Sequence, residues 1–183
     1  MRPKLYMAGR ALAGQSGHEA GRELLRQLYG AHVAGQMPEI CVAPSGKPHF
    51  ADSEWHFSIS HTKAHAFCVL ADRPVGLDAE EADRKIDLRL ANSILSPGEK
   101  AQFDAAADKR KALLTFWVLK EAAAKLSGEG LRGYPRHTDF SLEDPRVQEV
   151  CGCLVAVMEA EPAGNGFFPE EIMISEQGDC DAV

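Results

Sequence analysis

Three short β-type segments divided by tight turns constrain the fold of this 183-residue chain more than any other feature. They cover residues 56–60, 65–71 and 75–80. The last two are separated only by Asp72-Arg73-Pro74, a sequence that is typical of a hairpin turn. We therefore expect the chain to fold around a sheet that contains this hairpin.

Helix signals lie on both sides of this sheet. Two Ser-x-x-Glu capping boxes begin at Ser16 and Ser96, and Pro97 occupies the favoured first helical position after the second one. Gly128 is typical of a residue that ends a helix. The predicted helices cover about residues 17–29, 97–107 and 109–127.

Further strands give the chain the α+β fold class. A strand is predicted over residues 39–43. Residues Thr138–Leu142, Val147–Met158 and Glu171–Ser175 are expected to complete an antiparallel sheet. Because 45% of the residues are hydrophobic and no segment resembles a linker, we expect a single domain over residues 1–183.

Charge and hydropathy argue against two classes of partner. A formal charge of -7 offers no basic surface for the backbone of a nucleic acid. No stretch is apolar for long enough to span a bilayer, and the first residues lack the apolar run of a signal peptide. We therefore expect a cytoplasmic protein that binds neither nucleic acid nor membrane.

A pair of carboxylates marks the first chemical motif, Val-Gly-Leu-Asp-Ala-Glu at residues 75–80. The two-residue period of a strand puts Asp78 and Glu80 on one face, where both can approach one cation. Magnesium prefers oxygen ligands and commonly takes one or two carboxylates together with substrate phosphate and water. A solvated face of an edge strand explains the same pair, so this motif alone leaves both interpretations open.

The longest predicted helix carries the second motif, Trp-Val-Leu-Lys-Glu-Ala-Ala-Ala-Lys at residues 117–125. Trp117, Glu121 and Lys125 recur every four residues and therefore lie along one side of the helix. Glu121 is a candidate third carboxylate for the metal, and Lys125, one turn further on, is a candidate phosphate ligand. An ordinary ion pair between Glu121 and Lys125 is the alternative.

Two further segments offer hydrogen-bond donors. In Phe-Ser-Ile-Ser-His-Thr at residues 57–62, Ser58 and Ser60 are expected on the open side of a strand, with His61 at its end. Lys47, in the Gly-Lys-Pro turn at residues 46–48, is a candidate phosphate contact. The alternatives are a satisfied structural histidine and a lysine that only decorates a turn.

Together the four motifs resemble the 4′-phosphopantetheinyl transferase superfamily, in particular its surfactin-synthetase-activating type. They stand in the family's order, as GKP, FSISHT, VGLDAE and WVLKEAAAK, and Gly128-Glu129-Gly130-Leu131 follows them. Only 46 residues precede Lys47, which indicates a shortened N-terminal half. The resemblance implies a monomer with two pseudo-repeats of a helix packed on an antiparallel sheet, divided near residues 70–75.

The resemblance also implies roles for individual residues. The implied magnesium ligands are Asp78, Glu80 and Glu121, with the ion bridging the pyrophosphate of coenzyme A. The implied coenzyme A-binding residues are Lys47, Pro48, Ser60, His61, Lys120 and Lys125. The implied catalytic residues are Asp78, Glu121 and Lys125, with Glu121 as the base for the carrier serine.

The activity implied by the resemblance is that of a holo-carrier-protein synthase. Such a magnesium-dependent enzyme transfers 4′-phosphopantetheine from coenzyme A to a serine of an apo acyl or peptidyl carrier protein and releases 3′,5′-ADP. Carriers of fatty-acid, polyketide and nonribosomal peptide synthesis all remain candidates. Two other functions stay open: an inactive homologue that binds coenzyme A or a carrier protein, and a metal-dependent phosphohydrolase.

Overall fold

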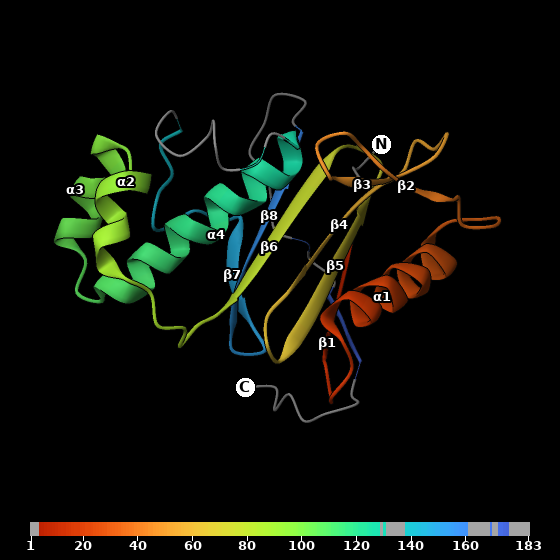
Figure 1. Cartoon of the computed structure of the whole chain (residues 1–183), viewed down its shortest axis with the longest axis horizontal. Coiled ribbons are helices and arrows are strands. Elements are labelled where there is room, and N and C mark those ends of the chain that lie inside the picture. The colour runs from red at the N-terminus through yellow and green to blue at the C-terminus, as the bar shows by residue number, and fades with distance from the viewer. Residues whose placement is uncertain (1–3, 129, 131–137, 161–168, 170–171, 176–183) are drawn as a thin grey trace.

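The computed structural model describes residues 4–128, 130, 138–160, 169 and 172–175. Helices and strands are combined as expected for the α+β fold class, and the described strands form two larger sheets and one small hairpin (Figure 1). No described helix has both the length and the apolar character needed to cross a membrane.

The first sheet carries α1 on one of its faces (Figure 1). In spatial order its strands are β4 (His56–His61), β5 (His65–Ala71), β1 (Leu5–Ala11) and β9 (Ile172–Ser175). β5 pairs antiparallel with β4 and β1, whereas β9 pairs parallel with β1. α1 (Gly17–His32) buries Leu24, Leu25 and Leu28 in the core on this face, so its apolar side holds it on the sheet.

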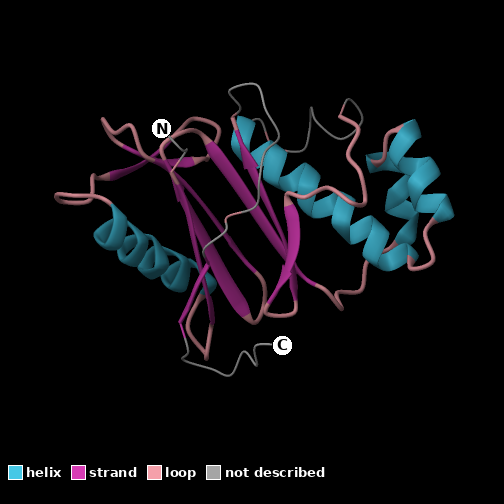
Figure 2. Ribbon diagram, turned by 180° about the vertical axis from the view of Figure 1, so that it is seen from behind, coloured by secondary structure: helices cyan, strands magenta, loops and turns pink. Residues whose placement is uncertain are grey.

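The second sheet carries α4 in the same way. Its strands are β6 (Val75–Glu81), β8 (Cys153–Glu159) and β7 (Val147–Val150), in that order and antiparallel. α4 (Lys109–Ser127) crosses one face and buries Leu113, Phe116 and Leu119. Three short helices, η1 (Leu88–Leu90), α2 (Ala91–Ile94) and α3 (Pro97–Ala105), lie beside the N-terminal half of α4 (Figures 1 and 2).

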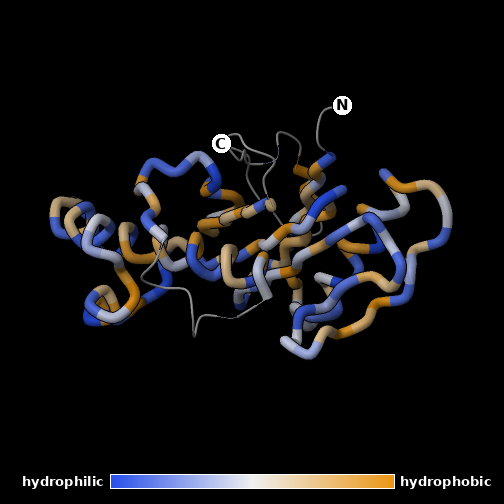
Figure 3. The backbone as a smooth tube through the Cα atoms, turned by 90° about the horizontal axis from the view of Figure 1, so that it is seen from above, coloured by the Kyte–Doolittle hydropathy of each residue, from blue (hydrophilic) through white to orange (hydrophobic). Residues whose placement is uncertain are grey.

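Serine side chains join the two sheets where β4 and β6 run side by side. The Oγ atom of Ser58 accepts a hydrogen bond from the Leu77 nitrogen at 3.0 Å, and the Oγ atom of Ser60 accepts one from the Ala79 nitrogen at 3.2 Å. Both serines are only 6% exposed, because β6 covers the side of β4 that was expected to be open; each serine nevertheless lines a cavity. On the strands around them, apolar stretches run through the middle of the molecule (Figure 3).

The predicted helices are confirmed as α1, α3 and α4. The Ser16 side chain accepts a hydrogen bond from the Glu19 nitrogen, and Ser96 and Glu99 form the reciprocal capping box. Gly128 ends α4 in the left-handed conformation, with a φ of 76°. These local signals required no knowledge of the tertiary fold.

The strands were predicted less completely. β2 (Ile40–Val42) lies inside the predicted segment 39–43, but its partner β3 (Pro48–Phe50) and the central strand β1 have no counterpart in the prediction. The segment predicted as one strand over 147–158 is divided into β7 and β8 by a turn. Cys151 and Gly152 form this turn with left-handed φ values of 50° and 68°.

The predicted completion of an antiparallel sheet by three C-terminal segments is also partly wrong. Residues 138–142 form no strand, because the Phe140 nitrogen donates to Glu99 and the Leu142 nitrogen donates to Gln102 of α3. β9 confirms the last predicted strand, although it pairs parallel with β1. Glu171, the first residue of that predicted strand, lies outside the described residues.

Candidate functional site

Gly76 allows α4 to lie directly on β6. A Cβ atom at this position would stand 2.1 Å from the Ala122 carbonyl oxygen and 2.5 Å from the Leu126 nitrogen, so a larger residue would force the helix away. The close approach sets the C-terminal half of α4 over the strand that carries Asp78 and Glu80. Two sequence motifs that are far apart in the chain are thereby brought together.

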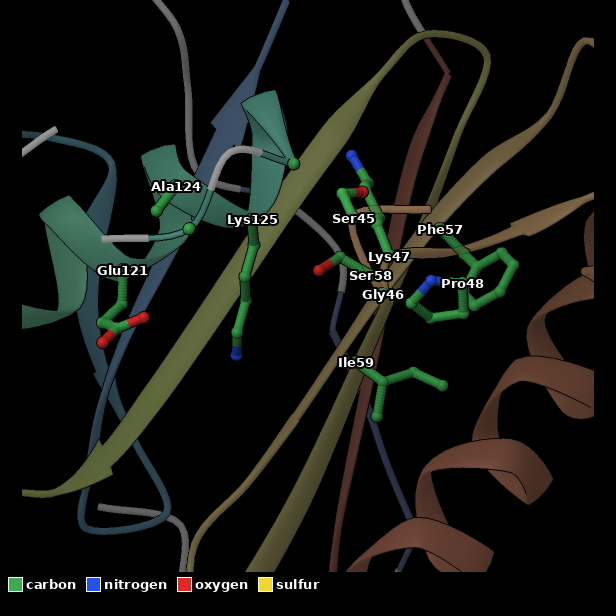
Figure 4. A pocket seen from close by; sticks show the side chains of 12 residues that line it. Ser45, Gly46, Lys47, Pro48, Phe57, Ser58, Ile59, Glu121, Ala124 and Lys125 are labelled. Atoms are coloured by element: carbon green, nitrogen blue, oxygen red, sulfur yellow. The ribbon is translucent and has the colours of Figure 1, made fainter. Parts of the chain in front are cut away.

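Two adjoining cavities of about 270 and 330 Å³ lie beside this half of α4. Glu121 and Lys125 line both cavities, together with Ile59 of β4. Figure 4 shows these three side chains around the first cavity. Lys47 and Pro48 line the first cavity. The second is lined by Ser60, His61, Asp78, Glu80, Arg84 and Trp117. The fold therefore gathers residues of all four sequence motifs.

Asp78 and Lys125 are directly paired in the second cavity. The Lys125 Nζ atom donates to Asp78 Oδ1 at 2.7 Å and to Ser60 Oγ at 3.0 Å, and Ser60 itself donates to the same Oδ1 atom at 3.0 Å. Asp78 is only 6% exposed, and its Oδ2 atom has no hydrogen-bond partner among the described residues. Burial of a carboxylate oxygen without a hydrogen-bond partner costs free energy, so Asp78 Oδ2 is suited to bind an external cation or hydrogen-bond donor.

An arginine that the sequence motifs did not reveal holds Glu80. Arg84, in the turn after β6, donates from Nη1 to Glu80 Oε1. Its guanidinium carbon lies 5.8 Å from the ring centroid of Trp117, and Trp117 lines the same cavity. No periodicity of helix or strand extends into this turn, so the sequence pattern held no signal for Arg84.

The cavity makes Glu80 and Glu121 stronger proton acceptors than exposed glutamates. Burial raises the pKa of both carboxyl groups above the usual value. At Glu121 the Asp78 carboxylate raises the pKa further, whereas Lys125 opposes the rise. At Glu80 the Arg84 guanidinium opposes it. A half-buried carboxylate of this kind is suited to accept a proton from a substrate.

Lys47 ties the turn before β3 to the end of α4. Its Nζ atom donates to the carbonyl oxygen of Leu126 at 2.8 Å and to that of Val75 at 3.4 Å. Burial lowers the pKa of this ammonium group. Because an ammonium carries three N–H donors, these two bonds leave capacity for one acceptor on a ligand in the first cavity.

His61 ends β4 against the start of α1. A Cβ atom on Gly17 would stand 2.4 Å from His61 Cγ, so the imidazole packs on the backbone of the first helical turn. His61 itself is exposed, in contrast to the neighbouring Ser60. The exposed ring beside a helix N-terminus adds a donor at a place where the helix dipole favours negative charge.

Lys120 is the expected site residue that the structure places elsewhere. It is 1% exposed, lines neither cavity, and forms a 2.8 Å ion pair with Glu99 of α3. Glu99 also accepts hydrogen bonds from the nitrogens of Ser96 and Phe140. The ammonium points into the α3–α4 core because this buried carboxylate requires a cation.

The three cavity carboxylates do not converge on one point. Within the described parts of the chain, no group of three or more His, Cys, Asp or Glu side chains is arranged to hold a metal ion. Asp78 and Glu80 have Lys125 and Arg84 as direct partners instead. The residues nevertheless suit a hard divalent ion, because the unpartnered Asp78 Oδ2 and the neighbouring carboxylates supply oxygen ligands.

Comparisons with known proteins point to one family. Residues 74–155 match the model of the 4′-phosphopantetheinyl transferase superfamily. The chain is 32% identical over 88 residues to the 4′-phosphopantetheinyl transferase gsp of Aneurinibacillus migulanus, which covers 47% of this chain and 36% of that protein. These matches confirm the resemblance carried by the sequence motifs.

Two further relatives share longer segments. The 4′-phosphopantetheinyl transferase AcpT of Escherichia coli (strain K12) is 34% identical over 114 residues, or 60% of this chain and 56% of AcpT. The 4′-phosphopantetheinyl transferase HetI of Nostoc sp. is 30% identical over 122 residues, or 61% of this chain and 52% of HetI. The chain thus spans about half the length of the curated relatives it matches.

Proposed function

We propose, from its kinship with the 4′-phosphopantetheinyl transferase superfamily, that this chain transfers 4′-phosphopantetheine from coenzyme A to a serine of an apo carrier protein. The observation that carries the proposal is the direct pairing of Lys125 with Asp78 beside Glu121 and Glu80. A cationic side chain next to clustered carboxylates matches what phosphoryl transfer needs, namely positioning and neutralisation of developing charge.

The proposed reaction moves one phosphoryl-linked group. The serine oxygen of the carrier attacks the phosphorus that bears the pantetheine, and the bond from this phosphorus to the oxygen bridging the pyrophosphate breaks. 3′,5′-ADP leaves with that electron pair, and the Glu121 carboxylate accepts the serine proton. The raised pKa of Glu121 favours this role.

The hydrogen-bond donors around both cavities would bind coenzyme A. Lys125 and His61 border the second cavity and would pair with phosphate oxygens, while Ser60 orients Lys125 through their shared hydrogen bond. Lys47 would use its remaining N–H donor beside Pro48 in the first cavity. Lys120 would support coenzyme A binding indirectly, because its ion pair with Glu99 of α3 keeps α4, the helix that carries Glu121, in position.

A magnesium ion fits the proposal through Asp78, Glu80 and Glu121. The Asp78 Oδ2 atom would be its first ligand, because this buried oxygen has no partner among the described residues. When bound, the ion would neutralise charge on the pyrophosphate of coenzyme A. Lys125 keeps the other oxygen of Asp78 in place through its own bond.

The finer features of the fold enter the same proposal. We infer a single domain over residues 1–183 with two pseudo-repeats, each a helix on a sheet, divided near residues 70–75. A monomer in the cytoplasm that acts on acyl or peptidyl carriers completes the proposed description. Carriers of fatty-acid, polyketide and nonribosomal peptide synthesis are its candidate substrates.

Intact-mass spectrometry of a carrier protein tests this function. Purified chain, coenzyme A and magnesium should add one phosphopantetheine to an apo carrier, and chelation of the metal should stop the addition. Asp78→Asn and Glu121→Gln should abolish the transfer while leaving the circular dichroism spectrum unchanged. A carrier of unchanged mass with every carrier class would refute the proposal.

Calorimetry and the mass of coenzyme A in the same mixtures separate the alternatives. Binding of coenzyme A or carrier without turnover would identify an inactive homologue, and hydrolysis of coenzyme A without a carrier would identify a phosphohydrolase. We favour the transferase because the matched relatives named above are all 4′-phosphopantetheinyl transferases.

A further inference from the structure

Arg84 is a cation in the second cavity to which the proposed reaction assigns no role. It donates from Nη1 to Glu80 Oε1 and lies over the ring of Trp117. The Arg84 side chain is 39% exposed, whereas that of Glu80 is 22% exposed. The arginine can therefore leave this contact toward solvent while the carboxylate stays in the wall of the cavity.

The charges around the cavity show why this contact matters. Asp78, Glu80 and Glu121 supply three carboxylates, and Lys125 and Arg84 supply two cationic side chains. Asp78 and Glu80 each already have one of those cations as a direct partner. A divalent cation that approached both carboxylates would meet both positive side chains at short range, and such repulsion is strong away from bulk water.

We propose that Arg84 is an exchangeable counterion of Glu80, which neutralises this carboxylate in the ligand-free site and yields it to a divalent cation when coenzyme A binds. The inference rests on the proposed function. Released from Glu80, the guanidinium still borders the same cavity, where its fork of N–H donors suits a phosphate oxygen. Arg84 thus positions Glu80 before binding and contacts the pyrophosphate afterwards.

The net charge in the cavity determines when a divalent cation can replace Arg84 at Glu80. A divalent cation alone adds positive charge next to Arg84, so its affinity for the ligand-free site should be low. When the anionic pyrophosphate arrives with the cation, their charges offset each other, and the pyrophosphate offers Arg84 a new partner. Binding of the cation and of coenzyme A should therefore be positively coupled, and Arg84 should carry part of that coupling.

Binding of Mn²⁺ alone, counted by electron paramagnetic resonance, tests the exchange without any turnover. Arg84→Gln should bind Mn²⁺ about tenfold more tightly than the unaltered chain, because the competing charge is gone. Arg73→Gln is the matched control, since Arg73 pairs with Asp72 and Glu159 at the opposite end of β6. Equal or weaker Mn²⁺ binding by Arg84→Gln, or no measurable binding by it, would overturn the inference.

A double-mutant cycle separates exchange at Glu80 from a long-range charge effect. In a Glu80→Gln background, Arg84→Gln should no longer increase Mn²⁺ affinity. A full tenfold gain in that background would show that Arg84 does not act through Glu80. With saturating Mg²⁺, Arg84→Gln should also bind coenzyme A severalfold more weakly, as measured by calorimetry. Unchanged affinity would refute the proposed contact between Arg84 and a phosphate oxygen.

The outcome for Arg84 is distinguishable from that for the proposed function. Phosphopantetheine transfer by the unaltered chain, with Mn²⁺ affinity unchanged in Arg84→Gln, would sustain the transferase proposal and refute the exchange. Tighter Mn²⁺ binding by Arg84→Gln in a chain that modifies no carrier would sustain the exchange and refute the transferase proposal.

Discussion

The Lys125 ammonium lies 2.7 Å from Asp78 Oδ1, while the other oxygen of the same carboxylate is buried without a partner in the described structure. One residue belongs to α4 and the other to β6, 47 positions apart in the chain. Their pairing therefore depends on the close contact between helix and strand at Gly76. Substitution of Lys125 should therefore affect mainly coenzyme A binding, whereas substitution of Gly76 should also lower the free energy of unfolding.

Replacement of Lys125 by methionine should weaken coenzyme A binding by about 1.5–3 kcal/mol, because it removes a charge-assisted hydrogen-bond donor from the cavity. Isothermal titration calorimetry at fixed magnesium concentration measures the change. Lys100→Met is the control, since Lys100 pairs with Asp104 and lies over the Phe103 ring on α3, and it lines neither cavity. Equal affinity in both variants would place the phosphates elsewhere.

Replacement of Gly76 by alanine should displace α4 from β6, because the new Cβ atom would meet the Ala122 carbonyl oxygen at 2.1 Å. We expect the free energy of unfolding in urea to fall by about 1–3 kcal/mol, as in other overpacked cores. Coenzyme A affinity should fall as well. Gly30→Ala in α1 has open space around it and should be neutral or stabilising, so equal behaviour of the two variants would contradict this reasoning.

Lys120→Met tests whether this residue acts in the core or on coenzyme A. Loss of one partner of a buried ion pair should lower the free energy of unfolding by about 3–5 kcal/mol, because Glu99 would keep an uncompensated charge. Glu99→Gln combined with Lys120→Met should recover part of this loss. If Lys120→Met keeps full stability but loses coenzyme A affinity, Lys120 contacts the ligand directly.

The raised pKa of Glu121 predicts a pH-dependent loss of stability in the presence of chelator. The folded chain retains this proton to higher pH than the unfolded chain, whose reference value is 4.5. The stabilising contribution is therefore present below that value and is lost as pH rises through the folded pKa. Urea midpoints across this range should fall further for the unaltered chain than for Glu121→Gln.

Glu143→Gln is the matched control for that comparison, because Glu143 is exposed outside the cavity. Its urea midpoints should follow those of the unaltered chain at every pH. If the midpoints of Glu121→Gln follow them too, the carboxyl group is not perturbed by its neighbours in the way described.

Local signals in the sequence were sufficient for the three longest helices and for most of the proposed site. The caps at Ser16 and Ser96 and the left-handed Gly128 fixed helix ends through hydrogen bonds within a few residues. The period of two placed Asp78 and Glu80 together on β6, and both line one cavity in the structure. Where hydrogen bonds within a few residues fix the structure, the sequence was a sound guide. The hairpin predicted around Asp72-Arg73-Pro74 was wrong, because β5 pairs with β4 and β1 whereas β6 pairs with β8 in the other sheet.

The α+β class, the three longest helices and the four motifs could be predicted from the sequence, because each depends on neighbouring residues. Which side chains meet across the chain depends on the packing of distant segments. This packing placed β1 between β5 and β9, sent Lys120 to Glu99 in the core, and brought Arg84 onto Glu80. Strand order and the direction of a turn side chain depend on packing between distant segments, and no local periodicity records that packing.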